Sequence, residues 1–317
     1  MNKLIIDKVS ENIPSNVKLV DYLMDILNLS RESIYRRVRG DLPFTFDQVM
    51  TLSSELKFSL DSIGSRDNSD SSCFRMRTPN EISPEEKYKI MLTNCDKLLE
   101  RQLKAKDMGA IVTMNRIFDL FSVAFDKLSH FFYYRWLHQA KDLPFNYNLS
   151  NLILPDDVKE LQKKIAMNHH KVDNTTFFVD SDSLKNTILE IRYYYDRGHI
   201  NDEELSLLKA DMAQMIDLSE ITARKGYHDS DHKFDYYISE IPIPVNSILI
   251  WYDDNTELFI WPYTINPLFN KNSDEVKNIH LEWIASMKKR SASISQSNEA
   301  LQERHYRQQR EYLNSIL

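Results

Sequence analysis

Before residue 64, apolar residues recur every three to four positions in short segments, which is the spacing of helices with one buried face. The pattern predicts helices over 3–12, 15–27, 31–38 and 45–56, and a last turn over 59–63. Ser15, Ser30 and Thr45 are candidate N-caps, because a side-chain oxygen at such a position accepts one of the first backbone N–H groups of a helix. We expect a compact unit of about five helices.

A polar stretch separates this unit from the rest of the chain. Residues 64–72 are rich in serine and aspartate, and Pro79 and Pro84 follow soon after. Such a segment buries too little apolar surface to fold by itself and is typical of a linker. We therefore expect a first domain over 1–65, a linker over 66–83 and a second domain over 84–317.

Long amphipathic segments dominate the second domain. Their spacing and capping residues predict helices over 83–105, 107–140 (with a break), 155–170, 183–197, 201–225, 274–289 and 296–316. Runs rich in Tyr, Ile, Trp and Phe predict strands over 234–241, 246–252 and 257–263. We expect these strands to form a small antiparallel meander. The fold class is then mainly α, with a helical bundle followed by a larger, mostly helical α+β domain.

Composition narrows the classes of function. Glycine is scarce, with 5 in 317 residues, which argues against glycine-rich phosphate loops and dinucleotide-binding folds. Cys73 and Cys95 are too few for a disulfide framework or a multi-cysteine zinc site. The first residues lack the apolar core of a signal peptide, and no apolar run approaches the ~18 residues of a membrane span. We expect a cytoplasmic protein with no membrane partner.

Charge is distributed unevenly along the chain, whose formal net charge is −7. Residues 1–66 carry nine basic and nine acidic side chains, whereas residues 67–317 carry 31 and 38 and therefore hold the whole negative excess. Within the neutral part, residues 31–39 include four arginines and one glutamate. A local basic cluster of this kind is typical of a nucleic-acid contact, even in an acidic protein.

The basic cluster falls on a predicted helix-turn-helix, in which a tight turn at residues 28–30 joins two helices and Gly40 ends the second. The second helix of this motif lies in the DNA major groove. Arginine side chains suit guanine, glutamate suits cytosine, and serine hydroxyls suit phosphate. The candidate DNA-binding residues are Ser30, Arg31, Glu32, Ser33, Tyr35, Arg36, Arg37 and Arg39.

Residues 24–40, with Phe44-Thr-Phe and Leu52 to Leu60, resemble the lambda-repressor-like (xenobiotic-response-element type) DNA-binding domain over about 50 residues. Ser30, Ile34 and Gly40 match the family pattern. The resemblance implies that Arg31, Glu32 and Arg36 occupy base-reading positions and that Ser30 contacts phosphate. The sequence departs from the family at four positions. Met24 replaces a small residue, and Asn28 replaces glycine. Arg37 occupies a position that is normally apolar, and Val38 occupies one that is normally polar. A rotated last turn of the second helix would accommodate the last two changes.

Signals in the second domain are weaker. Residues 128–138 and 294–310 resemble the C-terminal part of bacterial helix-turn-helix regulators that have no assigned activity, so they imply architecture and no chemistry. Aromatic clusters suit a small-molecule pocket, a dimer interface or an ordinary core, and they lie at 131–136, 193–195, 236–237 and 251–261.

Three further groups of polar residues favour a structural interpretation. The segment His228-Asp-Ser-Asp-His232 and the pair His169-His170 contain metal-ligand residue types, but neither has a third His or Cys close in sequence. Arg304, Arg307 and Arg310 share one helix face that is typical of solvent exposure, with contact to the DNA backbone or to acidic side chains of a partner as the alternative. We expect no metal site and no cofactor.

No nucleophile elbow, phosphate loop, zincin motif or kinase motif is present, so we expect no enzyme. The sequence favours a transcriptional regulator that binds double-stranded DNA sequence-specifically as a homodimer. Its second domain would mediate oligomerisation and respond to a small-molecule or protein effector. The alternatives are a protein-interaction scaffold whose N-terminal bundle binds protein, and an enzyme fused to a DNA-binding domain.

Overall fold

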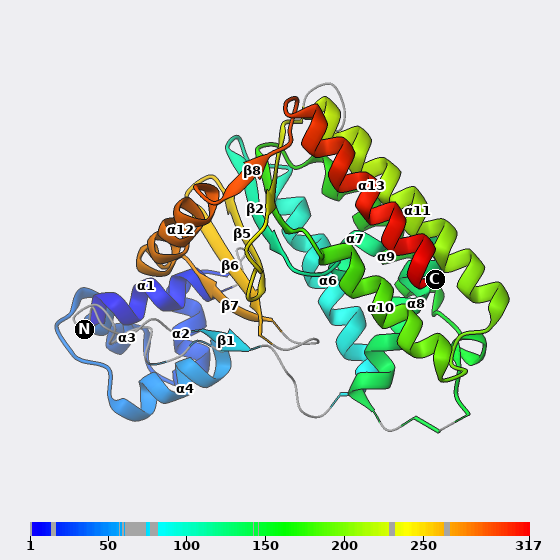
Figure 1. Cartoon of the computed structure of the whole chain (residues 1–317). Helices are drawn as coiled ribbons and strands as arrows, with labels where there is room; N and C mark the ends of the chain where they lie inside the picture. Colours follow the sequence, from blue (N-terminus) through cyan, green and yellow to red (C-terminus); the bar gives the residue numbers. More distant parts are fainter. Residues whose placement is uncertain are drawn as a thin grey trace. The chain divides into compact units, whose positions relative to one another are not determined.

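The computed structural model describes residues 2–13, 17–56, 58, 60, 74–76, 82–141, 143–144, 146–227, 232–262 and 267–317. The chain divides into two compact units, Met1–Cys73 and Phe74–Leu317, and each is described by itself (Figure 1). The predicted linker over 66–83 is wrong at one point, because Arg75–Met76 form strand β1, which pairs with a strand of the second unit. Residues 66–73 and 77–81 lie outside the described residues.

The first unit is helical in its described part. Its helices are α1 (Asn2–Asn12), α2 (Leu19–Leu27), α3 (Arg31–Arg39) and α4 (Phe46–Leu56). Each helix contributes apolar side chains to one core, whose buried members are Ile5, Val9, Leu23, Ile34, Phe44, Leu52 and Phe58. The predicted cap at Ser15 lies outside the described residues, and so does the predicted turn over 59–63 except for residue 60.

The second unit is built around a mixed sheet of eight described strands in the order β1-β7-β6-β5-β2-β3-β4-β8. Strands β2, β3 and β4 run parallel to one another. All the remaining neighbouring pairs are antiparallel. The bounds of the longer strands are Met108–Met114 (β2), Thr175–Asp180 (β3), Phe234–Ser239 (β4), Asn246–Tyr252 (β5) and Asn255–Trp261 (β6). Those of the short strands are Leu268–Lys271 (β7) and Ser291–Ser293 (β8). The unit is therefore α+β.

The predicted small meander is wrong, although its three strands exist. Strand β4 is separated from β5 by β2 and β3, and the meander is instead β5-β6-β7. The predicted helix over 107–140 is also wrong at its start, which forms β2. A central strand covered on both faces reads as a continuous apolar run, so its sequence lacks the alternation that marks a strand.

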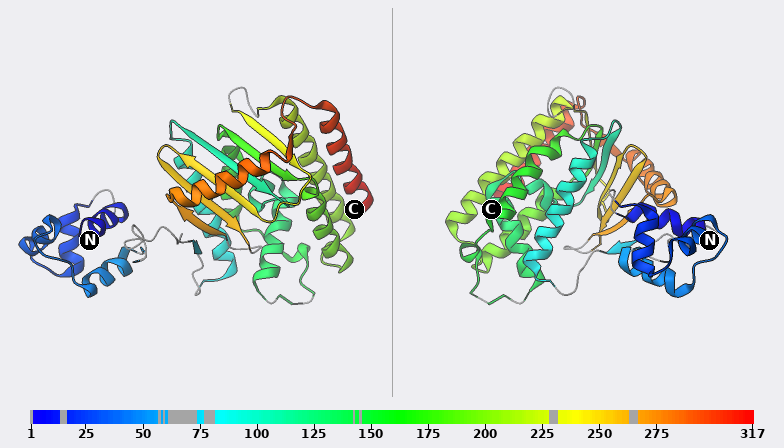
Figure 2. Two further views of the ribbon diagram at one scale, coloured as in Figure 1. Left: turned by 60° about the vertical axis from the view of Figure 1, so that its left-hand side comes forward. Right: turned by 180° about the vertical axis from the view of Figure 1, so that it is seen from behind.

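Helices cover both faces of the sheet (Figure 2). On one face, α12 (Asp274–Lys288) packs through Val276, Ile284 and Met287. The opposite face is covered by the remaining long helices, α6 (Pro84–Gln102), α8 (Asp126–Ala140), α9 (Asp156–Asn168), α10 (Ser183–Asp196), α11 (Asp202–Lys225) and α13 (Glu299–Ile316). The one-turn helix α7 (Asp119–Ser122) and the 3-10 turns η1 (Leu149–Asn151) and η2 (His169–Lys171) connect them.

Helix α8 forms the centre of the helical layer. Phe131, Phe132, Tyr133 and Tyr134 are fully buried, so the aromatic cluster at 131–136 is mainly core. Among them lies the buried Arg135, whose guanidinium pairs with Asp119 (2.5 Å) and Glu190 (2.7 Å). A buried cation is tolerated only with such partners. No helix in the described part of the chain is both long enough and apolar enough to cross a bilayer.

Candidate functional site

Two helices and a tight turn form the candidate nucleic-acid site of the first unit. Helix α2 ends at Asn28, whose backbone is left-handed with φ 51° and ψ 48°. Ser30 then caps α3, because its Oγ accepts a hydrogen bond from the Ser33 N–H at 3.3 Å. Gly40 ends α3 with φ 88°. Asparagine is one of the few residues besides glycine that adopt this left-handed conformation routinely, so Asn28 fits the turn.

The exposed side of α3 is a continuous basic stripe, which we call the α3 face. At 100° per residue, its side chains fill one arc of the helix, while Ile34 and Arg37 point to the opposite side and are buried. The α3 face consists of Arg31, Glu32, Tyr35, Arg36 and Arg39. It carries three guanidinium groups and one carboxylate.

Arg37 does not belong to this face, which corrects its place among the DNA-binding candidates. Only 6% of the residue is exposed. Its Nε donates to Gln48 Oε1 (3.1 Å), and its Nη1 donates to the carbonyl oxygen (3.1 Å) and Oγ (2.6 Å) of Ser33. Gln48 Oε1 also accepts from the Thr45 N–H at the start of α4. Arg37 therefore fixes α3 to α4, and α3 keeps regular helical geometry without a rotated last turn.

The remaining candidate DNA-binding residues differ in whether other side chains already bind them. Arg31 pairs with Asp21 at 2.5 Å, and this hydrogen bond raises the pKa of the guanidinium. Arg39 lies 3.4 Å from Asp41. Both pairs are exposed and therefore weak, so DNA phosphates can replace the carboxylates. Arg36 forms no ion pair with any residue that the structure describes. The hydroxyl of Ser33 accepts a hydrogen bond from Arg37. The hydroxyl of Ser30 accepts one from the Ser33 N–H, as the N-cap of α3.

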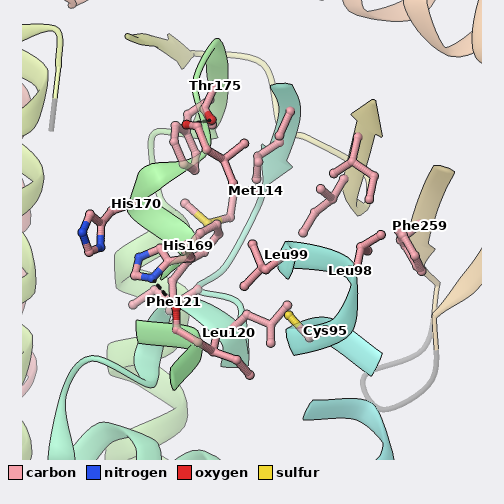
Figure 3. Close-up of a pocket in the computed structure, with 18 of the residues that line it drawn as sticks. Cys95, Leu98, Leu99, Met114, Leu120, Phe121, His169, His170, Thr175 and Phe259 are labelled. Atoms are coloured by element: carbon pink, nitrogen blue, oxygen red, sulfur yellow. Dashed lines mark hydrogen bonds between the residues drawn. The ribbon is translucent and has the colours of Figure 1, made fainter. Parts of the chain in front are cut away.

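The second unit holds a large cavity between the sheet and the helices on its more thickly covered face. Its volume is about 890 Å³, within the range of sites that hold small ligands. Strands β2 to β7 form one wall, and the other is formed mainly by α6, α7, α9 and α11. Apolar side chains from both walls converge on this space (Figure 3), among them Cys95, Leu98, Leu99, Met114, Leu120, Phe121 and Phe259.

Incomplete burial identifies the cavity as open space. Phe177, Ile248 and Phe259 lie in the middle of strands, on the face of the sheet opposite α12. Each nevertheless remains partly exposed. Burial raises the pKa of the Cys95 thiol to about 12, so the thiol is protonated at neutral pH and is not a nucleophile. His169 lies against Phe121 in the wall, with ring centroids 6.2 Å apart.

A polar cluster marks one end of the cavity. The carboxylate of Glu257 is buried, accepts a hydrogen bond from the Tyr252 hydroxyl (2.7 Å) and lies 3.5 Å from Lys271 Nζ. Burial, together with Glu257, raises the pKa of Tyr252 to about 12, so the hydroxyl keeps its proton and donates. The described residues contain no group of three or more His, Cys, Asp or Glu arranged to hold a metal ion.

Sequence reasoning missed this cavity, although it named some of the residues that form it. Of the aromatic clusters, Trp136, Tyr236, Phe259 and Trp261 contribute to the lining. Most of the other lining residues are ordinary apolar positions from ten elements, and only the fold brings them together. The His228 to His232 segment lies outside the described residues except for His232.

The chain has no counterpart in three comparisons: no family model, no curated protein and no solved structure matches it.

Proposed function

We propose that this protein is a transcriptional regulator that binds double-stranded DNA sequence-specifically through the α3 face. The observation that carries the proposal is the exposure of Arg31, Arg36 and Arg39 on the second helix of a helix-turn-helix. The turn before that helix is tight, and the side of α3 opposite these arginines is buried in the core. An α-helix with its side chains is about 10–12 Å across, so α3 fits a major groove about 12 Å wide.

The chemistry of the α3 face supports base reading as well as phosphate contact. Arg31 and Arg36 offer forked donors that match guanine, and Glu32 offers an acceptor for cytosine. Arg39, at the far end of α3, is placed for the DNA backbone. Tyr35 is 44% exposed and adds a flat contact surface between the arginines. A turn over 59–63 would complete a five-helix bundle of the lambda-repressor-like type.

The proposal includes a homodimer, because one short helix reads too few base pairs to single out a site in a genome. Two copies of α3, placed one helical turn of DNA apart, read two half-sites and multiply the specificity. We assign dimerisation to the second unit, whose cavity also provides room for an effector.

Selection of genomic DNA fragments on the full-length protein tests the proposal. Wild type should enrich a shared, two-fold symmetric site. The Arg31→Ala/Arg36→Ala double variant should bind that site at least 100-fold more weakly, because each lost base contact costs about 1–3 kcal/mol.

A matched control removes two arginines elsewhere. Arg304 and Arg307 are exposed on α13, so Arg304→Ala/Arg307→Ala changes the net charge equally and should leave the affinity within about threefold. If neither wild type nor control enriches DNA at low salt, the regulator proposal fails. Equal loss in both double variants would show non-specific attraction and also contradict it. Retained binding of a protein partner by the Arg31→Ala/Arg36→Ala variant would favour the scaffold.

A further inference from the structure

The charges that line the cavity are unbalanced in the direction opposite to the rest of the second unit. Residues 74–317, which form this unit, carry 31 basic and 36 acidic side chains and therefore a net charge of −5. Yet the charged lining residues that the structure describes, histidines aside, are four cations and one carboxylate: Lys87, Lys97, Arg101, Lys271 and Glu257. Such a concentration of positive charge favours an anionic ligand.

The single carboxylate cancels only one of the four cations, so three remain uncompensated. Glu257 is paired with Lys271 and accepts the Tyr252 hydroxyl. In contrast, Lys87, Lys97 and Arg101 form no ion pair within 4 Å with any described residue. Arg101 belongs to the same polar end, because its charge acts on the Tyr252 hydroxyl. This end of the cavity therefore keeps one uncompensated guanidinium.

Polar and apolar residues follow one another in order along the cavity. Alternate residues of a strand face the same side, so Glu257, Phe259 and Trp261 of β6 all point toward the cavity. On the neighbouring strand, Lys271 pairs in register with Glu257, and Phe269 pairs with Phe259. The site thus changes from charged to aromatic over about 13 Å, at ~3.3 Å per residue.

We propose that the cavity binds a single-chain amphiphile with an anionic head. The head lies against Arg101 and Lys271, and the alkyl chain extends along Phe259 and Trp261 into the apolar space between β6 and α6. Arg101 and Lys271 are exposed to solvent. An anionic head would gain ion pairs with them that a neutral ligand cannot make, and a cationic head would be repelled. This inference does not depend on DNA binding, and its test contains no DNA.

Calorimetric titration of the full-length protein with three ligands of equal chain length tests the assignment. Decanoate, decanol and decylamine share one apolar tail and differ in the charge of the head. We expect saturable binding of one decanoate per chain, at least tenfold tighter than decanol, with decylamine the weakest.

Three variants locate the ligand. Arg101→Glu should weaken decanoate at least tenfold and change decanol by no more than twofold. Lys289→Glu makes the same charge change at an exposed residue after α12, on the other side of the sheet, and should change neither. Leu98→Trp fills the space between the walls and should abolish binding of both ligands. Circular dichroism and thermal unfolding establish that each variant is folded.

Several results would overturn the assignment. One is the absence of saturable decanoate binding to wild type, and another is equal binding of all three ligands. A third is an Arg101→Glu variant that behaves like Lys289→Glu. Decanoate binding that survives in a folded Leu98→Trp variant would place the ligand outside this cavity and would contradict the proposal too.

Discussion

Arg37 and Arg36 are adjacent in the sequence and have opposite roles in the first unit. The guanidinium of Arg37 is buried and donates three hydrogen bonds to Gln48 and Ser33, whereas Arg36 is exposed on the α3 face. A buried charged donor stabilises the fold only through its partners, and its loss leaves those partners unsatisfied. Neighbouring arginines should therefore separate stability from DNA affinity.

We predict that Arg37→Ala lowers the free energy of unfolding of the first unit by about 2–4 kcal/mol, because it removes three hydrogen bonds to a charged group and leaves a void. Arg36→Ala should change it by less than about 0.5 kcal/mol. Hydrogen exchange measured by mass spectrometry on the full chain localises the effect to α1–α4. Equal protection of these helices in the two variants would contradict the burial of Arg37.

These two residues also show what the sequence could predict of the site. The spacing of apolar residues, the cap at Ser30 and the glycine at 40 place the helix and its ends. They do not show which arginine points inward, because an arginine at an apolar position is buried only if a partner is present. That partner, Gln48, lies 11 residues away on another helix.

His280 in α12 provides a pH-dependent contribution to stability. It is 7% exposed, its Nε2 has no hydrogen-bond partner among the described residues, and burial lowers its pKa to about 4. Between pH 6.5 and 4 the unfolded chain binds a proton at this residue that the folded chain does not. The contribution of His280 to the free energy of unfolding is therefore complete above pH 6.5 and is lost as the pH falls toward 4.

We predict that His280→Leu reduces this acid sensitivity. A difference of about 2.5 pKa units corresponds to about 3 kcal/mol, at 1.36 kcal/mol per unit. The free energy of unfolding, measured by urea denaturation at several pH values, should fall by about 3 kcal/mol less in the variant than in wild type between pH 6.5 and 4. Carboxylates titrate in both proteins and cancel in the comparison. If the free energy of unfolding depends on pH in the same way in both proteins, protonation of His280 does not destabilise the fold and the prediction is wrong.

At the scale of elements, the pairing of β2 with β5 depends on a residue without a side chain. Gly109 lies opposite Trp251, and a Cβ at position 109 would come within 2.0 Å of Cζ2 of the indole ring. The indole N–H donates to Asp107 at 3.3 Å, which holds the ring over the glycine. Close approach of a ring to the backbone explains a glycine inside a central strand.

We predict that Gly109→Ala lowers the free energy of unfolding by at least 1–3 kcal/mol through overpacking. In a Trp251→Ala background the same change should cost less than about 1 kcal/mol, because the ring is absent. A double-mutant cycle with urea denaturation followed by circular dichroism measures the difference. Additive effects of the two substitutions would contradict the contact.

Elements with local signals were predictable, and their arrangement was not. The sequence predicts the start of α6 from the cap at Ser83 and the end of α11 from Gly226, because caps are local interactions. It fails for β2 and β3, which are covered on both faces and lie between strands distant in sequence. The order of strands follows from long-range pairing such as β2 with β5, which local periodicity does not encode.

At the scale of the whole molecule, the negative charge is concentrated after residue 66. Residues 1–66 are neutral, and residues 67–317 carry the net charge of −7. An acidic second unit repels DNA at every surface except where cations are concentrated, and this limits non-specific binding. If the α3 face is the DNA contact, the affinity should depend strongly on salt, because phosphates release their counterions when arginines neutralise them.

The last prediction concerns the size of that salt dependence. A dimer that neutralises about four to six phosphates should lose roughly 10²–10³-fold in affinity for its selected site between 50 and 200 mM salt. Arg39→Ala removes one backbone contact from each copy, so the slope of log affinity against log salt should become shallower by about 2. Arg304→Ala, an exposed arginine outside the α3 face, should leave the slope unchanged. An affinity that does not change with salt would exclude phosphate contacts by the α3 face, and a slope altered equally by both variants would assign the salt dependence to the net charge of the chain.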